Sequence, residues 1–362
     1  MKKLLLTTAI LALSTAAAHA TPTVYGRISL SLDTIHADER VHPDAPDEYH
    51  VKSTRTKLNS TTGRIGVKGT EDISDDLSVF YQLEYGVTPD SGSSTQFNSR
   101  DTFLGVKHKK YGALTFGRMT TPDIMLEPYA NVVSMAVDGG DNILAAVDRA
   151  RLNNVVQYTS PTVNGVTGYL YYTLDENNVQ DWPLRNNLYS ATVKYEPTGK
   201  PYRVGASYTE APNQFKALRL AANYKVTPKT SVGAIYQNTD FDYLWGKDDA
   251  VQSRRITKVS NASDEHSYTV SVLHQTDTPW HLFTQYDYVD HAGSCEDAMK
   301  ERLVVGGKYY FNKSTIGHVY ASYKKDETVA SQTLWNQDFV SVAANSSHDK
   351  RYGVGVGLQY FF

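Results

Sequence analysis

The sequence predicts an all-β protein, a sixteen-stranded antiparallel transmembrane β-barrel, from three observations. The first is the final stretch, where Val354, Val356, Leu358, Tyr360 and Phe362 share one apolar strand face and alternate with Gly353, Gly355, Gly357, Gln359 and Phe361 on the other. The second is the repetition of such alternating segments, each near the ~10 residues that a tilted membrane strand needs. The third is the alternation of short turns with long polar connections. A barrel with a lipid-facing outer wall accounts for all three observations.

The first twenty residues predict an export signal. Two lysines precede an apolar stretch that ends at Leu13, and Ala18-His19-Ala20 has the form of a cleavage site. We therefore expect a signal peptide over 1–20 and one barrel domain over 21–362. Beyond residue 20, no run reaches the roughly 18 apolar residues that a membrane helix requires.

Alternation between apolar and polar residues identifies the strands in order. In the first strand, Ile28 and Leu32 lie on the face opposite Asp33, and much further along Val193 alternates with Lys194. The predicted strands are 23–36, 63–73, 77–88, 99–109, 113–120, 149–161, 166–176, 187–197, 202–210, 214–226, 231–241, 265–276, 280–291, 299–312, 315–326 and 349–362.

The connections favour a membrane barrel over a tyrosine-rich soluble sandwich. Short turns rich in Gly, Pro, Asn and Asp would lie at one rim and long loops at the other, and a sandwich has no reason to alternate so regularly. The short turns are 74–76, 110–112, 164–165, 197–200, 227–230, 277–279 and 312–314, and the main long stretches are 37–62, 121–148, 242–264 and 327–348.

Composition agrees with a membrane interface and argues against nucleic acid. The 26 tyrosines suit interface positions, because the ring lies in acyl chains while the hydroxyl reaches water. Without residues 1–20, 34 Lys and Arg stand against 39 Asp and Glu, which gives a net charge of −5. A nucleic-acid partner would require a basic face instead.

Basic residues within the strands are the first candidate functional set. An arginine near the midplane of the lipid face costs about 2–4 kcal/mol, so these side chains must point into the lumen. Because Ile65 and Val67 face outward, their neighbours face inward. The expected basic wall consists of Arg27, Arg64, Arg100, Arg151 and Lys68.

The long stretch 121–148 is the second candidate. It contains no Lys or Arg, and its apolar residues include Leu126 and Val133, which a solvated loop would not need. We expect it to fold into the barrel with its acids opposite the basic wall, and its candidates for a helical part are Ile143, Leu144 and Val147. Such a zone would filter solutes by size and charge. The candidate acids are Asp123 and Glu127 first, then Asp138 and Asp141.

Six short motifs in order give the chain a resemblance to the general diffusion porins of Gram-negative outer membranes, in particular the neisserial-type branch. Each motif is weak alone, and the loop alternation adds to them. The motifs are Thr23-Val24-Tyr25-Gly26-Arg27, Gly63 to Asp72, Ser99 to Val106, Gly112 to Arg118, Arg151-Leu152-Asn153-Asn154 and the final Phe362.

The resemblance implies a homotrimer in the outer membrane of a Gram-negative bacterium, with the third long loop inside each pore. The arginines would match the basic wall of that family, and Phe362 would be part of the signal read by the barrel-insertion machinery. The expected partners are therefore two further copies, outer-membrane lipid, the insertion machinery, and small hydrophilic solutes and ions. No cofactor or metal is expected.

A passive channel is the leading functional prediction, and three alternatives remain. A substrate-specific channel for a sugar or organic anion would call for an aromatic slide and commonly eighteen strands. A barrel enzyme needs a catalytic constellation that the sequence does not offer, since HExxH, GxSxG and CxxC motifs are missing. A surface adhesin is compatible with long loops and does not exclude a pore. We expect the chain not to be an enzyme.

Overall fold

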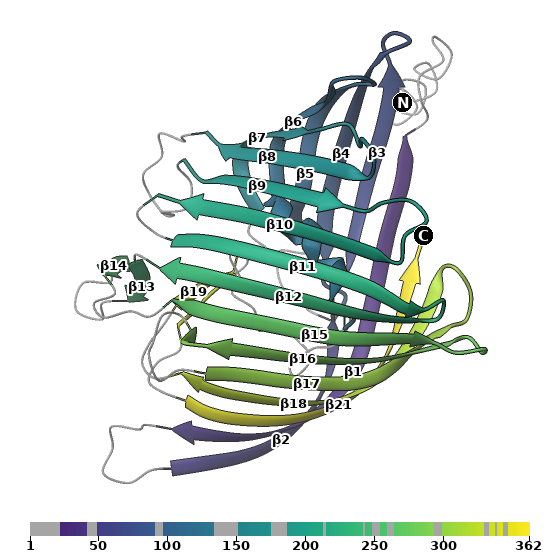
Figure 1. The fold of residues 1–362 in the computed structure, drawn as a ribbon. Helices are drawn as coiled ribbons and strands as arrows, with labels where there is room; N and C mark the ends of the chain where they lie inside the picture. Colours follow the sequence, from purple (N-terminus) through teal and green to yellow (C-terminus); the bar gives the residue numbers. More distant parts are fainter. Residues whose placement is uncertain are drawn as a thin grey trace, which may run out of the picture.

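The computed structural model shows a closed barrel, with one continuous wall of strands around a lumen (Figure 1). Among the described residues, no helix is both long and apolar enough to cross a membrane. The predicted signal peptide and the residues Asp138, Asp141, Ile143, Leu144 and Val147 lie outside the described residues. These are 22–41, 49–90, 97–133, 151–174, 187–212, 215–241, 243–247, 254–258, 264–292, 299–328, 333–336, 339–342 and 347–362.

Every predicted strand overlaps a strand of the wall, because the two-residue alternation that identified them is what a wall between lipid and water requires. The strands of the wall are β1 (Thr23–Val41), β2 (Tyr49–Ser60), β3 (Arg64–Asp72), β4 (Leu77–Val87), β5 (Phe97–His108), β6 (Gly112–Thr120), β7 (Arg151–Thr159), β8 (Val166–Thr173), β9 (Tyr189–Tyr195), β10 (Tyr202–Ala211), β11 (Phe215–Thr227), β12 (Thr230–Phe241), β15 (Glu265–Gln275), β16 (Trp280–Asp290), β17 (Met299–Tyr310), β18 (Thr315–Thr328) and β21 (Ser347–Phe361).

The wall has sixteen barrel strands, as predicted, because β2 and β3 are two parts of one strand. Both pair antiparallel with β1, β2 through Leu30↔Ser60 and β3 through Arg27↔Arg64. The register shifts by one residue between these pairs, so residues 61–63 form an irregularity within the wall. The barrel closes where β21 pairs with β18 on one side and with β1 on the other.

Three of the predicted long loops are partly wrong, because each contains strands. The stretch 37–62 includes the end of β1 and all of β2. The stretches 242–264 and 327–348 together supply a separate sheet in the order β14-β13-β19-β20, from β13 (Tyr243–Lys247), β14 (Arg254–Lys258), β19 (Thr333–Asn336) and β20 (Phe339–Val342). Away from lipid no face must be apolar, so such strands lack the alternation that reveals a membrane strand.

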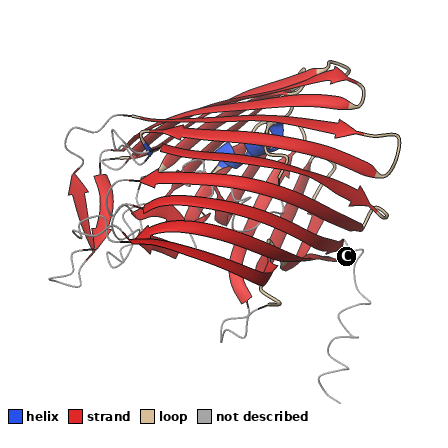
Figure 2. Ribbon diagram, turned by 90° about the horizontal axis from the view of Figure 1, so that it is seen from below, coloured by secondary structure: helices blue, strands red, loops and turns tan. Residues whose placement is uncertain are grey.

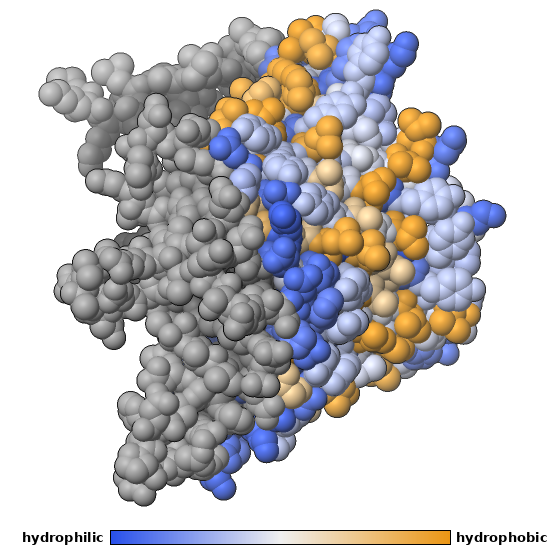
Figure 3. Space-filling model, turned by 60° about the vertical axis from the view of Figure 1, so that its left-hand side comes forward, coloured by the Kyte–Doolittle hydropathy of each residue, from blue (hydrophilic) through white to orange (hydrophobic). Residues whose placement is uncertain are grey.

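Side chains of the wall alternate between lipid and lumen as expected. On β21, Val354 and Leu358 are 57 % and 51 % exposed, whereas their neighbours Gly353 and Gln359 on the other face are buried. The same alternation places Ser29 and Asp33 of β1 on the buried side and Ile28 outside. Figure 3 shows apolar side chains spread over the outer face of the described wall. This outer face is the surface that lipid would cover.

The glycines of β21 allow side chains of its two neighbouring strands to contact each other across it. Asp33 on β1 accepts a hydrogen bond from the hydroxyl of Tyr320 on β18 at 2.5 Å, across the intervening β21. A Cβ at Gly355 would lie 2.2 Å from both Asp33 Oδ1 and Tyr320 Cε1. Any larger residue at this position would therefore push the bond apart. The close backbone approach expected of a glycine within a strand is the reason for Gly355.

We predict that Gly355→Ala destabilises the folded barrel by about 1–3 kcal/mol, because the added methyl overpacks the Asp33–Tyr320 contact. Thermal unfolding in detergent, followed by heat-modified gel mobility and circular dichroism, measures this loss. The matched control is Gly168→Ala on β8, where the nearest atom to an added Cβ would be Ser160 Oγ at 3.7 Å. Equal unfolding temperatures for the two variants would contradict the prediction.

Candidate functional site

The predicted basic wall is assembled from neighbouring strands on one side of the barrel. Arg27 lies on β1 directly opposite Arg64 of β3 in the antiparallel register. Arg100 lies on β5, and Arg151 is the first residue of β7. All four arginine side chains are partly buried. The alternation of lipid and lumen faces thus brings four residues that are distant in sequence to the same inner surface.

An acid that the sequence analysis did not select, Glu84 on β4, lies among these arginines. Its carboxylate accepts a hydrogen bond from Arg100 Nε at 2.6 Å and one from the Tyr25 hydroxyl at 3.0 Å. Arg64 Nη1 lies 3.5 Å from the same carboxylate. Glu84 is only 4 % exposed, so water screens these contacts weakly. Its position on the polar face of 77–88, beside Gln82, places it in the lumen, but no signal in the sequence separates it from other lumen residues.

A β-bulge in β5 aims two charged residues at different partners. The register between β4 and β5 shifts between Leu83 and Tyr85, so Arg100 and Asp101 together stand opposite Glu84. Arg100 binds Glu84, and Asp101 accepts a hydrogen bond from Arg151 Nε at 2.9 Å. Because the bulge adds one residue to β5, Arg100 can bind Glu84 while Asp101 binds Arg151. The arginines of β3 and β5 are thereby connected to the arginine of β7.

A second irregularity, between β6 and β7, holds another arginine beside this group. The register shifts between Gly117 and Met119, and Asn154 adopts a positive φ of 53°. Arg118 Nη1 donates to Asn153 Oδ1 at 2.7 Å and to the Arg151 carbonyl at 3.1 Å. The Arg151-Leu152-Asn153-Asn154 motif thus has a local structural role as well as supplying a charge.

Two predicted members of the wall have other partners. Arg27 Nε donates to the Thr62 carbonyl at 3.0 Å, and its guanidinium carbon lies 5.9 Å from the centre of the Phe361 ring. Lys68 is exposed, and its Nζ lies 5.0 Å from the centre of the Tyr25 ring.

The group formed by Arg27, Arg64, Arg100, Arg151, Glu84 and Asp101 is called the arginine cluster below. Its four positive and two negative charges leave an excess of two positive charges.

The first part of the predicted constriction loop lies inside the barrel. A 3₁₀-helix, η1 (Pro122–Tyr129), lies within the ring of strands in Figure 2. Asn223 Nδ2 on β11 donates to the Tyr129 carbonyl at 2.8 Å, and Arg203 Nη2 on β10 donates to the Pro128 carbonyl at 2.6 Å. The Val132 amide donates to Gln285 Oε1 on β16 at 3.0 Å. Residues 121–133 therefore cross from β6 to the inner surface of β16.

Apolar packing holds this segment against the wall. Leu126, Tyr129 and Ala130 are fully buried with Ala221 and Ile235 of the wall. Two glycines of the wall make room for this contact. A Cβ at Gly205 would lie 2.3 Å from Leu126 Cδ2, and a Cβ at Gly233 would lie 2.1 Å from the Tyr129 carbonyl oxygen. Val133 packs further along the wall, against Phe283, Val304 and Tyr320. The apolar residues of this described part therefore pack against the wall, whereas the folding of the whole loop 121–148 into the pore stays a prediction.

The loop acids fall in different environments. Asp123 is in the first turn of η1 and is 4 % exposed, whereas Glu127 is half-buried. That either acid faces the arginine cluster stays a prediction, as does any role of Asp138 and Asp141. The prediction of a helix around Ile143 falls outside the described residues, and within the described part of this stretch the helix is η1.

Comparison with known proteins finds outer-membrane proteins among the relatives of this chain. An outer membrane porin protein of Bordetella pertussis is 24 % identical over 405 residues, with 100 % of both chains covered. The major outer membrane protein P.IB of Neisseria meningitidis is 26 % identical over 343 residues, covering 90 % of this chain and 94 % of that protein.

Solved structures of porins share the fold. The anion-selective porin from Comamonas acidovorans has a TM-score of 0.69 at 18 % identity, covering 95 % of this chain and 100 % of that one. OmpF of Salmonella typhi has a TM-score of 0.63 at 18 % identity, covering 94 % and 97 %. The family profile described as Gram-negative porin matches residues 7–331. The chain therefore belongs to the Gram-negative porin family.

Proposed function

We propose that the arginine cluster makes this outer-membrane diffusion channel favour small anions over cations. The observation that carries the proposal is the convergence of four arginines with two acids, Glu84 and Asp101, among them. An excess of positive charge at one place on the lumen wall raises the local concentration of anions. The likeness to the anion-selective porin from Comamonas acidovorans supports the same sign.

The size filter that we propose is the loop 121–148. Its described part supports this, because residues 121–133 lie against the inner wall from β10 to β16 and take up space in the lumen. A charged wall opposite a fixed loop would admit small hydrophilic solutes and ions and retard larger ones. That the chain has no catalytic activity stays a prediction, as does any adhesin role of the long loops.

We also propose that three copies assemble in the membrane. The support is the resemblance to porins and the likeness to OmpT of Vibrio cholerae, one structure of which is described as a trimer form. Outer-membrane lipid and the insertion machinery are the further partners we propose. Phe362 suits an assembly signal, since the residue is 49 % exposed while its amide and carbonyl form hydrogen bonds with the backbone of Gly26.

Two substitutions in the arginine cluster are expected to shift selectivity in opposite directions. Glu84→Gln removes a negative charge and should increase anion preference, whereas Arg64→Gln should decrease it. A unit charge ~8 Å from a permeating ion in water is worth about 0.5 kcal/mol, so the permeability of each ion should change about twofold, in opposite directions for anion and cation, and the permeability ratio about fivefold. Reversal potentials under a KCl gradient measure it, and both shifts should shrink as salt rises.

The control for these two variants is Lys313→Gln, which removes an exposed charge in a short turn. Its reversal potential should equal that of the unmodified protein. Shifts of the same sign for Glu84→Gln and Arg64→Gln would contradict the proposal, because opposite charges were removed from one place.

Shortening the loop is expected to enlarge the pore. Replacing residues 134–147 by a short Gly-Ser linker keeps the contacts of 121–133 with the wall and should raise single-channel conductance and the size limit for sugars in liposome swelling. Glu127→Gln alone should shift the reversal potential in the direction of greater anion preference. A folded variant with unchanged conductance and size limit would show that the loop does not narrow the channel.

The trimer is expected to survive mild detergent. Light scattering of gently extracted protein should give a protein mass three times that of one chain, and bilayer currents should close in three equal steps. A monodisperse single barrel that conducts in one step would contradict this assembly.

A further inference from the structure

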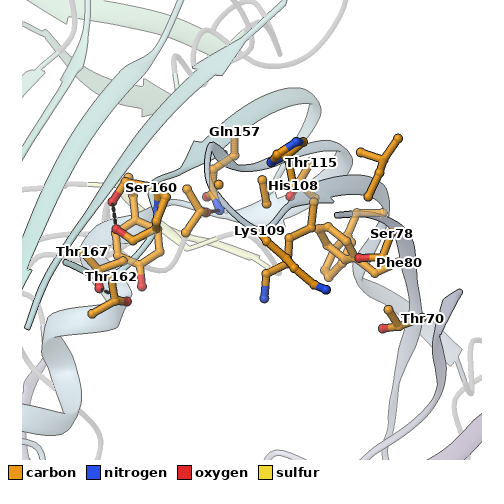
Figure 4. A pocket seen from close by; sticks show the side chains of 18 of the residues that line it. Thr70, Ser78, Phe80, His108, Lys109, Thr115, Gln157, Ser160, Thr162 and Thr167 are labelled. Carbon is orange, nitrogen blue, oxygen red and sulfur yellow. Dashed lines mark hydrogen bonds between the residues drawn. The ribbon is translucent and has the colours of Figure 1, made fainter. Parts of the chain in front are cut away.

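A cavity of about 1040 Å³ lies beside the arginine cluster, on the side of the short turns (Figure 4). It is lined by the inner faces of β3 to β9, by the turns that follow β3, β5 and β7, and by Met125 of η1. Figure 4 shows Phe80 and Ser78 on one side of the opening and Ser160, Thr162 and Thr167 across from them. We call this space the turn-side cavity. Its volume is at the upper end of the range for small-ligand sites.

The floor of the turn-side cavity is apolar, which a purely water-filled passage does not require. Phe80 and Phe103 stand edge to face with ring centres 6.1 Å apart. Phe80 lies over Gly105, where an added Cβ would come within 2.3 Å of its ring. Met125 reaches the same space from η1 and is 39 % exposed. These side chains offer a surface for a flat apolar group.

A cation stands beside this floor. Phe103, Gly105 and Lys107 share one face of β5, so Phe103 and Lys107 are separated by about 13 Å along the strand. Because Phe80 leans over Gly105, its ring lies between them. Lys107 is exposed and lines the cavity. An aromatic ring resting on Phe80 would place a carboxylate attached to it within reach of Lys107.

The acids that line the cavity are less well placed to bind the same solute. Asp101 is paired with Arg151, and Glu196 with Lys194 at 2.9 Å. Asp72 on β3 and Lys107 on β5 lie in the same cross-strand row, about 10 Å apart because β4 lies between them. The Phe80 ring leans from β4 toward β5, and therefore away from Asp72. Asp75 and Asp76 lie in the exposed turn beyond it.

We propose that the turn-side cavity is a binding subsite for small aromatic carboxylates, with the ring on Phe80, Phe103 and Met125 and the carboxylate at Lys107. The proposal rests on the proposed anion preference, since such a solute would pass the arginine cluster before it reaches the cavity from the long-loop side. The subsite would slow these solutes relative to inorganic anions and give the channel a chemical preference beyond size and charge.

The test is open-channel block in planar bilayers in dilute KCl (about 0.1 M), where charge effects extend ~10 Å. Three probes separate the contributions: benzoate, acetate, which lacks the ring, and benzylammonium, which inverts the charge. Benzoate should reduce the current at concentrations where the other two do not. Phe80→Leu and Lys107→Gln should each raise the half-blocking concentration of benzoate about fivefold.

Matched controls are Phe116→Leu, which removes a ring from the outer face of β6, and Lys313→Gln, which removes an exposed turn charge. Both should leave benzoate block unchanged. If Phe80→Leu fails to fold, Met125→Gln tests the same floor at an exposed position. Equal block by acetate or benzylammonium, or block that these cavity variants do not alter, would overturn the subsite. A channel that lacks anion preference would instead overturn the proposed function.

Discussion

Closure of the sheet between β1 and β21 is the constraint on which the rest of the barrel depends. In lipid an unpaired backbone amide or carbonyl costs several kcal/mol, so the first and last strands must pair along their membrane length. The register from Arg27↔Phe361 to Asp38↔Lys350 meets this requirement. Once the sheet is closed, each strand has one side in lipid and one in the lumen, and every side chain must take one side or the other.

The concentration of charge follows from this closure. Arginines that cannot face lipid turn inward, where Glu84 of β4 contacts both Arg64 of β3 and Arg100 of β5. Regular strands would leave these side chains in evenly spaced rows. The bulges at 61–63, at Arg100-Asp101 and at Asn153-Asn154 interrupt the rows and allow pairing between strands. Irregular backbone at the charged wall therefore converts a strand pattern into a site.

Prediction from the sequence succeeded for segments in which contact with lipid requires apolar residues, and it failed for segments without this requirement. All sixteen wall strands were found because one face of each had to be apolar, whereas β2 and the small outer sheet carry no such signature. The basic residues were found by the cost of placing arginine in lipid, but Glu84 was passed over because a single acid in a strand looks like any lumen residue. The burial of Asp123 depends on how η1 packs across the lumen, which no local pattern encodes.

The glycines of β21 have a consequence for how the last strand finds its place. Gly353, Gly355 and Gly357 stand opposite Ser322, Tyr320 and His318 of β18, so three positions without a side chain leave room for three side chains. A slip of two residues preserves which face is apolar, and lipid alone would accept it. The same slip would drive Gln359 against His318 in one direction or Arg351 against Ser322 in the other. The spacing of empty positions thus distinguishes the native alignment from neighbours that hydrophobicity treats as equivalent.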